Sequence, residues 1–357
     1  MADGASRCYP QPMATALSLE TAPSDGPTYP FGPIEAGAPV ELAPGVSLLR
    51  LAVPGPLRHV NCYLLADDGG TAVVDTGMDR PETRAAWEAL DGPRVSRVVG
   101  THFHPDHIGL AGWLCARHDA PLLMTRGEAL LAKLLVADAR DAAPGEILAW
   151  WRMAGWSDEQ VAQASARGWA GFRRIVSPLP YGFTRIADGD RLRIGAAEWR
   201  VVVGSGHSPE HACLLDERNG VLVAGDQVLP RISPNISLGA SEPDADPLGE
   251  WFASIATLRG LDPDLLVLPG HGDPFTGLHV RLDAMEREHR ERLDALAAHL
   301  GEPRRAADCF AALFRRPIGP DMLGMATGEA LAHLRRLERE GRAAFEDQDG
   351  VRWWRAD

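Results

Sequence analysis

Four side chains of the kinds that bind metal ions occur within a stretch of six residues. They are His102, His104, Asp106 and His107. Two positions separate the first pair of histidines, so both rings point to the same side of an extended chain. A proline then turns the chain, and Asp106 and His107 fall in the first turn of a predicted helix, where they can face back toward that pair. Imidazole and carboxylate ligands without a thiolate favour Zn²⁺, with Mn²⁺ or Fe²⁺ as alternatives.

Three further polar residues each follow an apolar run. His207 comes after VVVGSG, Asp226 after VLVAG and His271 after LLVLPG. The glycines beside them allow the backbone to approach an ion or a substrate closely. A single histidine after a strand is usually structural, but three such strand ends predict one shared site together with the first four residues.

The elements that must position these residues alternate between strands and helices. Residues 46–77 contain short β-rich runs, and Gly69-Gly70 marks a hairpin. A helix is expected over 81–90, with Asp79 as a possible cap. A strand over 94–103 and a helix over 106–118 follow. This order is typical of a layered α/β domain.

A second β-rich half begins at residue 191 and repeats this organisation. Asn219-Gly220 lies between two apolar runs and predicts a hairpin. A helix over 247–261, a strand over 264–272 and a long charged helix over 278–300 come next. Two such halves that face each other would bring the polar strand ends together.

Between the halves, residues 126–186 form a helical insert rich in tryptophan. Helices are expected over 127–139, 146–153 and 158–175. Trp150 and Trp151 could line a lid that seats an apolar acyl group, and Tyr181 could reach a substrate carbonyl. The alternative is that these tryptophans simply pack the insert onto the sheets.

The two ends of the chain differ in character. Residues 1–40 are rich in Pro, Gly, Ala and Ser and predict a flexible or surface-draped tail. After Pro303, helices around 307–314 and 328–340 and a terminal β-ribbon resemble a winged-helix unit. This unit carries ten arginines against nine acidic residues. DNA-binding winged helices are usually clearly basic, so we expect a packing role or a homodimer contact instead.

The polar motifs together resemble the metallo-β-lactamase superfamily. The pattern H-x-H-x-D-H is followed by GHSPEH, AGD and PGHGD, and the upstream Val74-Asp75-Thr76-Gly77 resembles the family's D-T-G strand end. The resemblance covers roughly residues 45–277. It implies an αββα sandwich over 41–277, with the helical insert at about 126–186 and a small winged-helix-like module over 278–357.

The resemblance also implies a dinuclear metal site with two Zn²⁺ ions per chain. One ion would be held by His102, His104 and His207, and the other by Asp106, His107 and His271. Asp226 would bridge the ions, and Asp106 and Asp226 are the acids assigned to catalysis. Asp75 would hydrogen-bond a ligand histidine and fix its tautomer. His211 is expected beside the site but not as a ligand.

Two cations at such a site imply hydrolysis by a hydroxide generated at the metals, without a serine or cysteine nucleophile. The presence of Asp226 differs from the antibiotic-hydrolysing enzymes, and His104 differs from the di-iron flavoproteins. We therefore expect a hydrolase of a small acyl thioester or ester. A phosphodiesterase or endoribonuclease, a lactonase and an iron-dependent dioxygenase are the alternatives. Arg231 is the candidate for binding a substrate anion.

The overall composition disfavours nucleic acid and a membrane as binding partners. The 357 residues carry 36 basic and 49 acidic side chains, for a net charge of −13, which disfavours binding to nucleic acid. No window approaches 18 apolar residues, so no membrane span is expected. Five scattered cysteines and the absence of a secretory signal fit the reducing cytoplasm. A small-molecule substrate is the expected ligand.

Overall fold

The computed structural model describes residues 26–90, 92 and 94–357. Its larger sheet has seven strands that pair in sequence order. They are β1 (Val40–Ala43), β2 (Val46–Ala52), β3 (His59–Asp67), β4 (Gly70–Val74), β5 (Val95–Val99), β6 (Leu122–Met124) and β7 (Thr184–Arg185). The pairs from β1 to β4 are antiparallel, and those from β4 to β7 are parallel.

The second sheet has five strands in the order β12-β11-β10-β9-β8. They are β8 (Arg191–Ile194), β9 (Ala197–Gly204), β10 (His211–Asp216), β11 (Val221–Gly225) and β12 (Leu266–Pro269). Only β11 and β12 run parallel. Both predicted hairpins are present: β3 and β4 meet through Asp68 and Gly69, and β10 and β11 through residues 217–220.

Alternating side chains explain why the two sheets stack. Val99 on β5 and Val74 on β4 face the other sheet, where they meet residues such as Val201 and Leu214. Their neighbours Val98 and Val73 point to the opposite face, toward helices. Successive residues of a strand project to opposite sides, so a strand apolar at every position must be covered on both faces.

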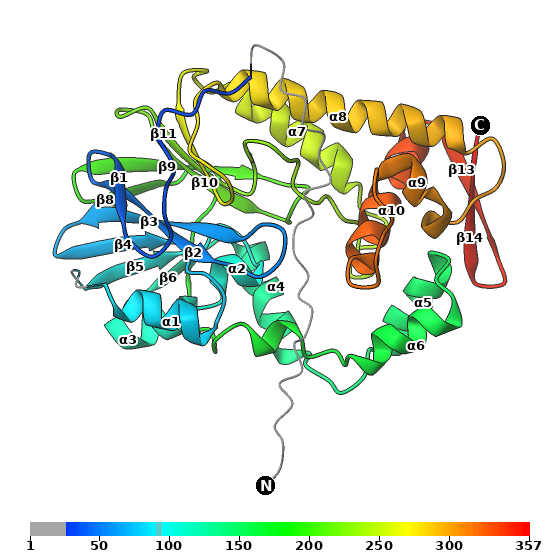
Figure 1. Cartoon of the computed structure of the whole chain (residues 1–357), viewed down its shortest axis with the longest axis horizontal. Helices are drawn as coiled ribbons and strands as arrows, with labels where there is room; N and C mark the ends of the chain where they lie inside the picture. The colour runs from blue at the N-terminus through cyan, green and yellow to red at the C-terminus, as the bar shows by residue number, and fades with distance from the viewer. Residues whose placement is uncertain (1–25, 91, 93) are drawn as a thin grey trace, which may run out of the picture.

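Helices cover the outer face of each sheet. The seven-stranded sheet carries α1 (Pro81–Glu88), α2 (Pro105–Ile108), α3 (Ala111–His118) and α4 (Arg126–Ala137), and the five-stranded sheet carries α7 (Pro247–Leu258) and α8 (Leu278–His299). Figure 1 shows α1 and α3 beneath one sheet and α7 and α8 above the other. The predicted αββα sandwich is confirmed.

Several predicted helix boundaries were wrong. The helix expected over 106–118 is broken after α2, because Gly109 packs so tightly that an added Cβ would stand 2.5 Å from the carbonyl oxygen of Pro105. Asp79 does not cap α1; its carboxylate instead binds Arg84 at 2.6 Å. The helix expected over 158–175 ends at Ala166, shortly before Gly168 adopts a left-handed φ of +77°.

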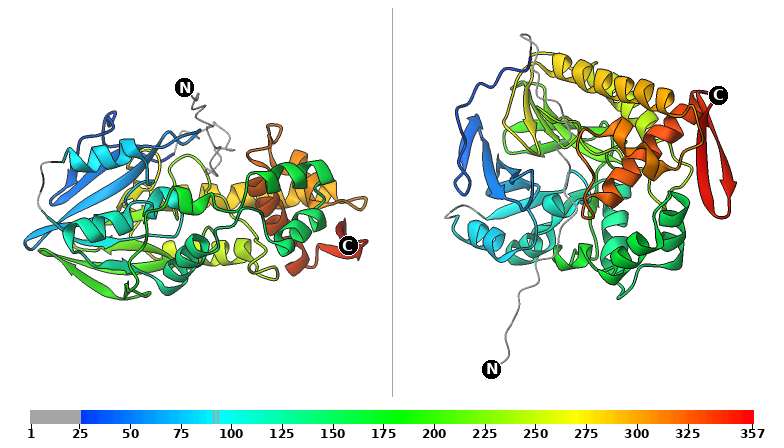
Figure 2. Two further views of the ribbon diagram at one scale, coloured as in Figure 1. Left: turned by 90° about the horizontal axis from the view of Figure 1, so that it is seen from below. Right: turned by 45° about the vertical axis from the view of Figure 1, so that its right-hand side comes forward.

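The helical insert and the C-terminal module pack against each other. The insert contains α5 (Gly145–Met153), α6 (Asp158–Ala166) and η1 (Phe172–Arg174). The module contains η2 (Ala306–Cys309), α9 (Phe310–Leu313), α10 (Leu323–Arg339), β13 (Ala343–Gln348) and β14 (Val351–Ala356). Trp156, in the turn between α5 and α6, donates from Nε1 to Thr327 Oγ1 at 2.8 Å and so joins the insert to α10. Figures 1 and 2 show α5 and α6 beside the module.

Of the two alternatives predicted for the tail over 1–40, residues 26–40 follow the surface-draped one and not the flexible one. Thr28 pairs with Thr276 through two backbone hydrogen bonds, and the carbonyl of Ile34 accepts from Arg50. Residues 1–25 lie outside the described part of the chain. The four cysteines that are described, at 62, 115, 213 and 309, are free and buried. In the described ranges, every helix is too short or too polar to cross a membrane.

Candidate metal centre

The seven side chains predicted as ligands converge in one cluster between the sheets. Four follow strands: His102 lies after β5, His207 after β9, Asp226 after β11 and His271 after β12. The other three, His104, Asp106 and His107, lie at the start of α2. All except the partly exposed His104 are buried. The strand ends meet at one edge of the sandwich, as the sequence predicted.

His102, His104 and His207 form the first half of the cluster, which we call the three-histidine group. The Nε2 atom of His102 lies 2.9 Å from Nδ1 of His104 and 3.3 Å from Nε2 of His207. Two nitrogen ligands of one tetrahedral zinc ion lie about 3.3 Å apart, since each Zn–N distance is about 2.0–2.1 Å. The three nitrogens therefore fit one ion.

Asp106, His107 and His271 form the second half, which we call the carboxylate group. The Nε2 atom of His271 lies 3.3 Å from Asp106 Oδ2, and that of His107 lies 3.8 Å from the same oxygen. Asp226 stands between the halves. One of its oxygens is 3.5 Å from His107 Nε2, and the other is 3.7 Å from His207 Nε2.

Unpartnered polar atoms test whether an ion fits this cluster. His107 Nε2, His271 Nε2 and Asp226 Oδ1 are all buried and have no hydrogen-bond partner. Buried polar atoms are nearly always paired, and these three point toward one another. A divalent cation would satisfy all of them at once. A Cβ at Gly270 would stand 2.2 Å from Asp226 Oδ1, so only glycine leaves room there.

His104 and Asp106 already have the protonation state that a metal ligand needs. Burial, reinforced by repulsion from His207, lowers the pKa of His104 to about 3, so its ring is neutral and can bind an ion. Burial opposes ionisation of Asp106, but the charges on His107 and His271 outweigh it and lower the pKa of that carboxyl to about 2. Neutral imidazole and ionised carboxylate are the forms that bind metals. Burial opposes protonation of His107 and His271, but the carboxylate of Asp226 outweighs it and raises the pKa of both rings, so each must give up a proton when an ion binds.

Asp75 supports the carboxylate group where the sequence placed it. Its Oδ2 lies 2.7 Å from His107 Nδ1, and its carboxylate also accepts from the backbone and hydroxyl of Thr101. This contact turns His107 Nε2 toward the cluster. His211 lies beside the site, as expected. It stacks on His102 at 4.8 Å, and its Nε2 accepts from the backbone N–H of Asp226.

Two family models match the chain. One is described as the metallo-beta-lactamase superfamily and matches residues 55–271, and the other is described as a metallo-beta-lactamase-like C-terminal domain and matches residues 293–357. The chain belongs to the metallo-β-lactamase superfamily. With its buried histidine–aspartate cluster, it is a metallo-hydrolase of that superfamily.

Similar proteins match across both the sandwich and the C-terminal module. A crystal structure of a beta-lactamase domain protein from Burkholderia ambifaria is 37% identical, covers 93% of this chain and 98% of its own, and has a TM-score of 0.84. The probable metallo-hydrolase YqjP of Bacillus subtilis is 29% identical over 83% of this chain and 92% of its own length. The atrochrysone carboxyl ACP thioesterase of Emericella nidulans is 27% identical over 88% of this chain and 85% of its length.

The residues predicted to bind substrate in this metallo-hydrolase lie in different places. Trp150 and Trp151 pack against the core shared with the C-terminal module, and Trp151 stacks on Trp156 at 4.8 Å. This is the packing alternative and not a lid. Tyr181 is fully exposed on the insert. Arg231 forms an ion pair of 3.7 Å with Asp273, two residues after the ligand His271.

Sequence analysis missed Glu128, a buried acid in the first turn of α4. Its carboxylate accepts from the backbone N–H of Phe103, the hydroxyl of Ser208 and the backbone N–H of Glu210. Burial raises its pKa to about 7, although these hydrogen bonds oppose the shift. Glu128 thus ties together two segments that carry the three-histidine group. Its only signal in the sequence was a lone acid near the start of a predicted helix.

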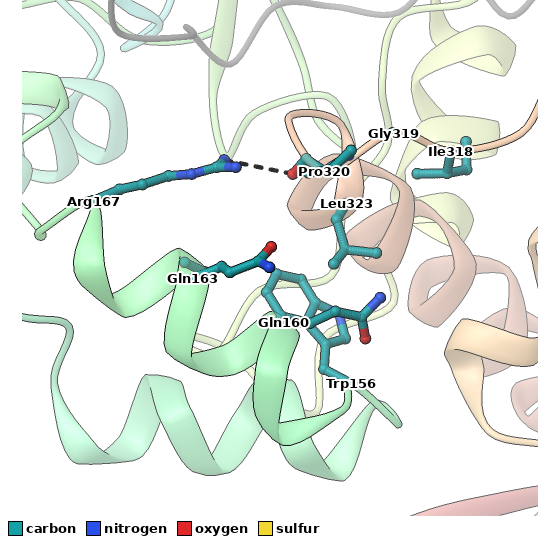
Figure 3. Close-up of a pocket in the computed structure, with 9 residues that line it drawn as sticks. Trp156, Gln160, Gln163, Arg167, Ile318, Gly319, Pro320 and Leu323 are labelled. Atoms are coloured by element: carbon teal, nitrogen blue, oxygen red, sulfur yellow. Dashed lines mark hydrogen bonds between the residues drawn. The ribbon is translucent and has the colours of Figure 1, made fainter. Parts of the chain in front are cut away.

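A pocket lies between α6 and the segment around the start of α10 (Figure 3). Its lining consists of Trp156, Gln160, Gln163, Ala164, Arg167, Ile318, Gly319, Pro320 and Leu323. Arg167 reaches across it to the carbonyl of Pro320 at 3.5 Å. The pocket shares no residue with the ligand groups, so it belongs to the contact between insert and module.

Proposed function

We propose that this metallo-hydrolase is a dinuclear enzyme that hydrolyses a small acyl thioester or ester. The position of Asp226 carries the proposal, because its two oxygens face both ligand groups at 3.5 Å and 3.7 Å. One tetrahedral ion uses four ligands, whereas this cluster supplies seven side chains. The cluster therefore has enough ligands for two ions.

In this proposal the three-histidine group would hold one ion, the carboxylate group would hold the other, and Asp226 would lie between them as a shared ligand. Zn²⁺ suits nitrogen and oxygen ligands, and Fe²⁺ or Mn²⁺ could replace it. Two bound ions would polarise the carbonyl oxygen of the substrate and lower the pKa of a water molecule toward neutrality.

The protein's own residues contribute by fixing charge and orientation. Asp226 and Asp106 supply ionised carboxylates, which offset the cations' charge within a buried site. The side chain of Asp106 is 13% exposed and that of Asp226 is 2% exposed, so Asp106 lies nearer the entrance. We propose that the substrate reaches the cluster from that side.

Two observations support an acyl thioester or ester as the substrate. The similar protein from Emericella nidulans is a thioesterase that acts on a carboxyl ACP, as its name says. A thiolate is also a good leaving group near neutral pH, because thiols have pKa values of about 8.5. A site without a dedicated general acid therefore suits a thioester.

The net charge of −13 argues against the phosphodiesterase alternative. A polyanion such as RNA would approach against a repulsive field, and contacts to phosphates usually supply most of its affinity. A neutral acyl group faces no such barrier.

A substrate panel with the purified, metal-loaded protein tests the proposal. Acyl thioesters, esters, lactones, a β-lactam, a phosphodiester and single-stranded RNA would be compared, with Asp226→Asn as the background control. We expect the thioesters or esters to be turned over fastest. Cleavage of RNA with a steep salt dependence, together with inert acyl substrates, would contradict the proposal and favour the phosphodiesterase.

A further inference from the structure

We propose that the C-terminal module positions the metal ligand His207, and that Glu329 on α10 is the residue through which it acts. The inference rests on the proposed role of His207 as a ligand. It gives the module a function at the metal centre, although the module contributes no side chain to either ligand group.

The first link joins His207 to a loop. The Nδ1 atom of His207 lies 2.8 Å from the backbone carbonyl oxygen of Asn235. A carbonyl can only accept, so Nδ1 must carry the proton and donate it. Nε2 then keeps its lone pair and faces the cluster, 3.3 Å from Nε2 of His102. The position of this carbonyl therefore sets both the tautomer and the direction of the ligand ring.

The second link joins that loop to α10. The side-chain Nδ2 of Asn235 donates to Glu329 Oε2 at 2.9 Å. Three residues further on, the backbone N–H of Leu238 donates to the carbonyl of Gly328 at 3.0 Å. A Cβ at Gly328 would stand 2.7 Å from the hydroxyl of Ser237, so the glycine allows this close approach. The loop is thus held against one turn of α10.

The third link fixes Glu329 itself. Its side chain is 6% exposed, and Oε1 accepts from Arg292 of α8 at 2.8 Å. One carboxylate oxygen is held by Arg292 and the other by Asn235, so the group cannot rotate freely. Removing one partner of a buried ion pair is strongly unfavourable, which makes this a firm anchor.

The loop needs such an anchor because it has no regular secondary structure between β11 and α7. A second tie lies nearby, where the hydroxyl of Ser233 and Nε2 of His289 on α8 are 2.6 Å apart. Figure 1 shows α10 beside α7 and α8 at the end of the sandwich, where it can hold the loop. Loops without such contacts are the most mobile parts of a fold.

Asn235→Ala tests the link most cleanly, because it removes the side-chain contact with Glu329 but keeps the backbone carbonyl that binds His207. Glu329→Gln is the conservative partner, because its amide oxygen can still accept from Asn235. Glu340→Gln is the matched control: this acid at the end of α10 also pairs with an arginine of α8, Arg290, at 3.2 Å.

Full-length wild type and variants would be loaded with Co²⁺, titrated with a chelator, and followed by metal content and by the visible spectrum. We expect Asn235→Ala to release one ion at about tenfold lower chelator concentration and to alter the spectrum of that ion only, since such supporting contacts are worth about 10–100-fold in affinity. Glu329→Gln should show a smaller change, and Glu340→Gln none. Thermal unfolding would show that each variant is folded.

The outcomes of this experiment distinguish failure of this inference from failure of the proposed function. A folded Asn235→Ala protein with wild-type affinity and spectrum for both ions would overturn the inference alone, as would equal weakening of both ions. A wild-type protein that holds fewer than two ions would overturn the dinuclear function, and the inference with it.

Discussion

The two ligand groups differ in what holds them in place. In the carboxylate group, His107 is fixed by Asp75 after β4, and Nδ1 of His271 lies 2.6 Å from the carbonyl of His59 on β3. Both supports belong to the seven-stranded sheet. In the three-histidine group, His207 depends on Asn235, in a loop held by the C-terminal module. The carboxylate group is thus supported from the seven-stranded sheet, whereas His207 is supported by a loop that the C-terminal module holds.

Because of this difference, we expect different substitutions to weaken the binding of each ion. Changes in the seven-stranded sheet should affect the carboxylate group, and changes in α4 or the module should affect the three-histidine group. Asp226 lies near both ligand groups, so its substitution should weaken the binding of both ions.

The largest effect is therefore expected from Asp226→Asn, which removes a negative charge between two cations. We expect a rate lower by on the order of 10²–10³-fold and the loss of one ion, because electrostatic organisation at a reacting centre is worth that much. Elemental analysis and kinetics would measure both. Asp216→Asn is the matched control, a buried acid that fastens the adjacent hairpin through Arg218 and Asn219. Normal metal content and a near-normal rate in Asp226→Asn would contradict the role of Asp226 as a ligand shared by both ions.

Glu128 holds two segments that carry the three-histidine group, and its ionisation should make the free energy of unfolding depend on pH. Its pKa is raised from 4.5 to about 7 in the folded protein, so folding disfavours the ionised form. Its contribution to the free energy of unfolding is greatest below pH 4.5 and falls as pH rises to about 7, by up to about 3 kcal/mol. Denaturant unfolding of the wild type and Glu128→Gln across this range would measure the difference between them. A difference that stays constant with pH would contradict the burial argument.

Asp75→Asn should weaken the ion of the carboxylate group, whereas Asn235→Ala should weaken the ion of the three-histidine group. The amide nitrogen that replaces one carboxylate oxygen cannot accept, so the backbone N–H of Thr101 or Nδ1 of His107 loses its acceptor and the support of His107 is weakened. We expect one ion to bind about 10–100-fold more weakly, while the ion of the three-histidine group keeps its affinity. Chelator titration with Co²⁺ would measure both. If the two variants weakened the same ion, the proposed division of supports would be wrong.

The smallest effect is expected at Arg231, which pairs with Asp273 shortly after the ligand His271. Its side chain is 64% exposed and lies 3.7 Å from Asp273. An exposed ion pair is worth less than about 1 kcal/mol, so Arg231→Ala should raise KM a few-fold for an acidic acyl substrate and leave kcat unchanged. A neutral acyl substrate is the control. Equal changes for both substrates would argue against a role in binding an anion.

The sequence predicted most of the sandwich and the ligand cluster because both depend on local patterns. The spacing of His102, His104 and Asp106 and the apolar runs before His207 and Asp226 can be read without tertiary contacts. The alternation of strands and helices predicted a layered α/β domain, and the resemblance of the polar motifs to the superfamily implied the αββα arrangement.

The supports could not be predicted, because they act through backbone groups or across the fold. Asn235 holds His207 by its carbonyl, which every residue possesses, and Glu329 lies 94 positions further along the chain. Trp150 and Trp151 suggested a lid because tryptophan favours both packing and ligand binding, and only the tertiary contacts place them beside the module. The fold of residues 26–40 onto the sandwich likewise depends on long-range pairing, such as that of Thr28 with Thr276.

The number of metal ions per chain tests the central claim most directly. Elemental analysis of a purified, fully active preparation should give two divalent ions for each chain, one for the three-histidine group and one for the carboxylate group. Full activity with one ion or fewer per chain would contradict the dinuclear account.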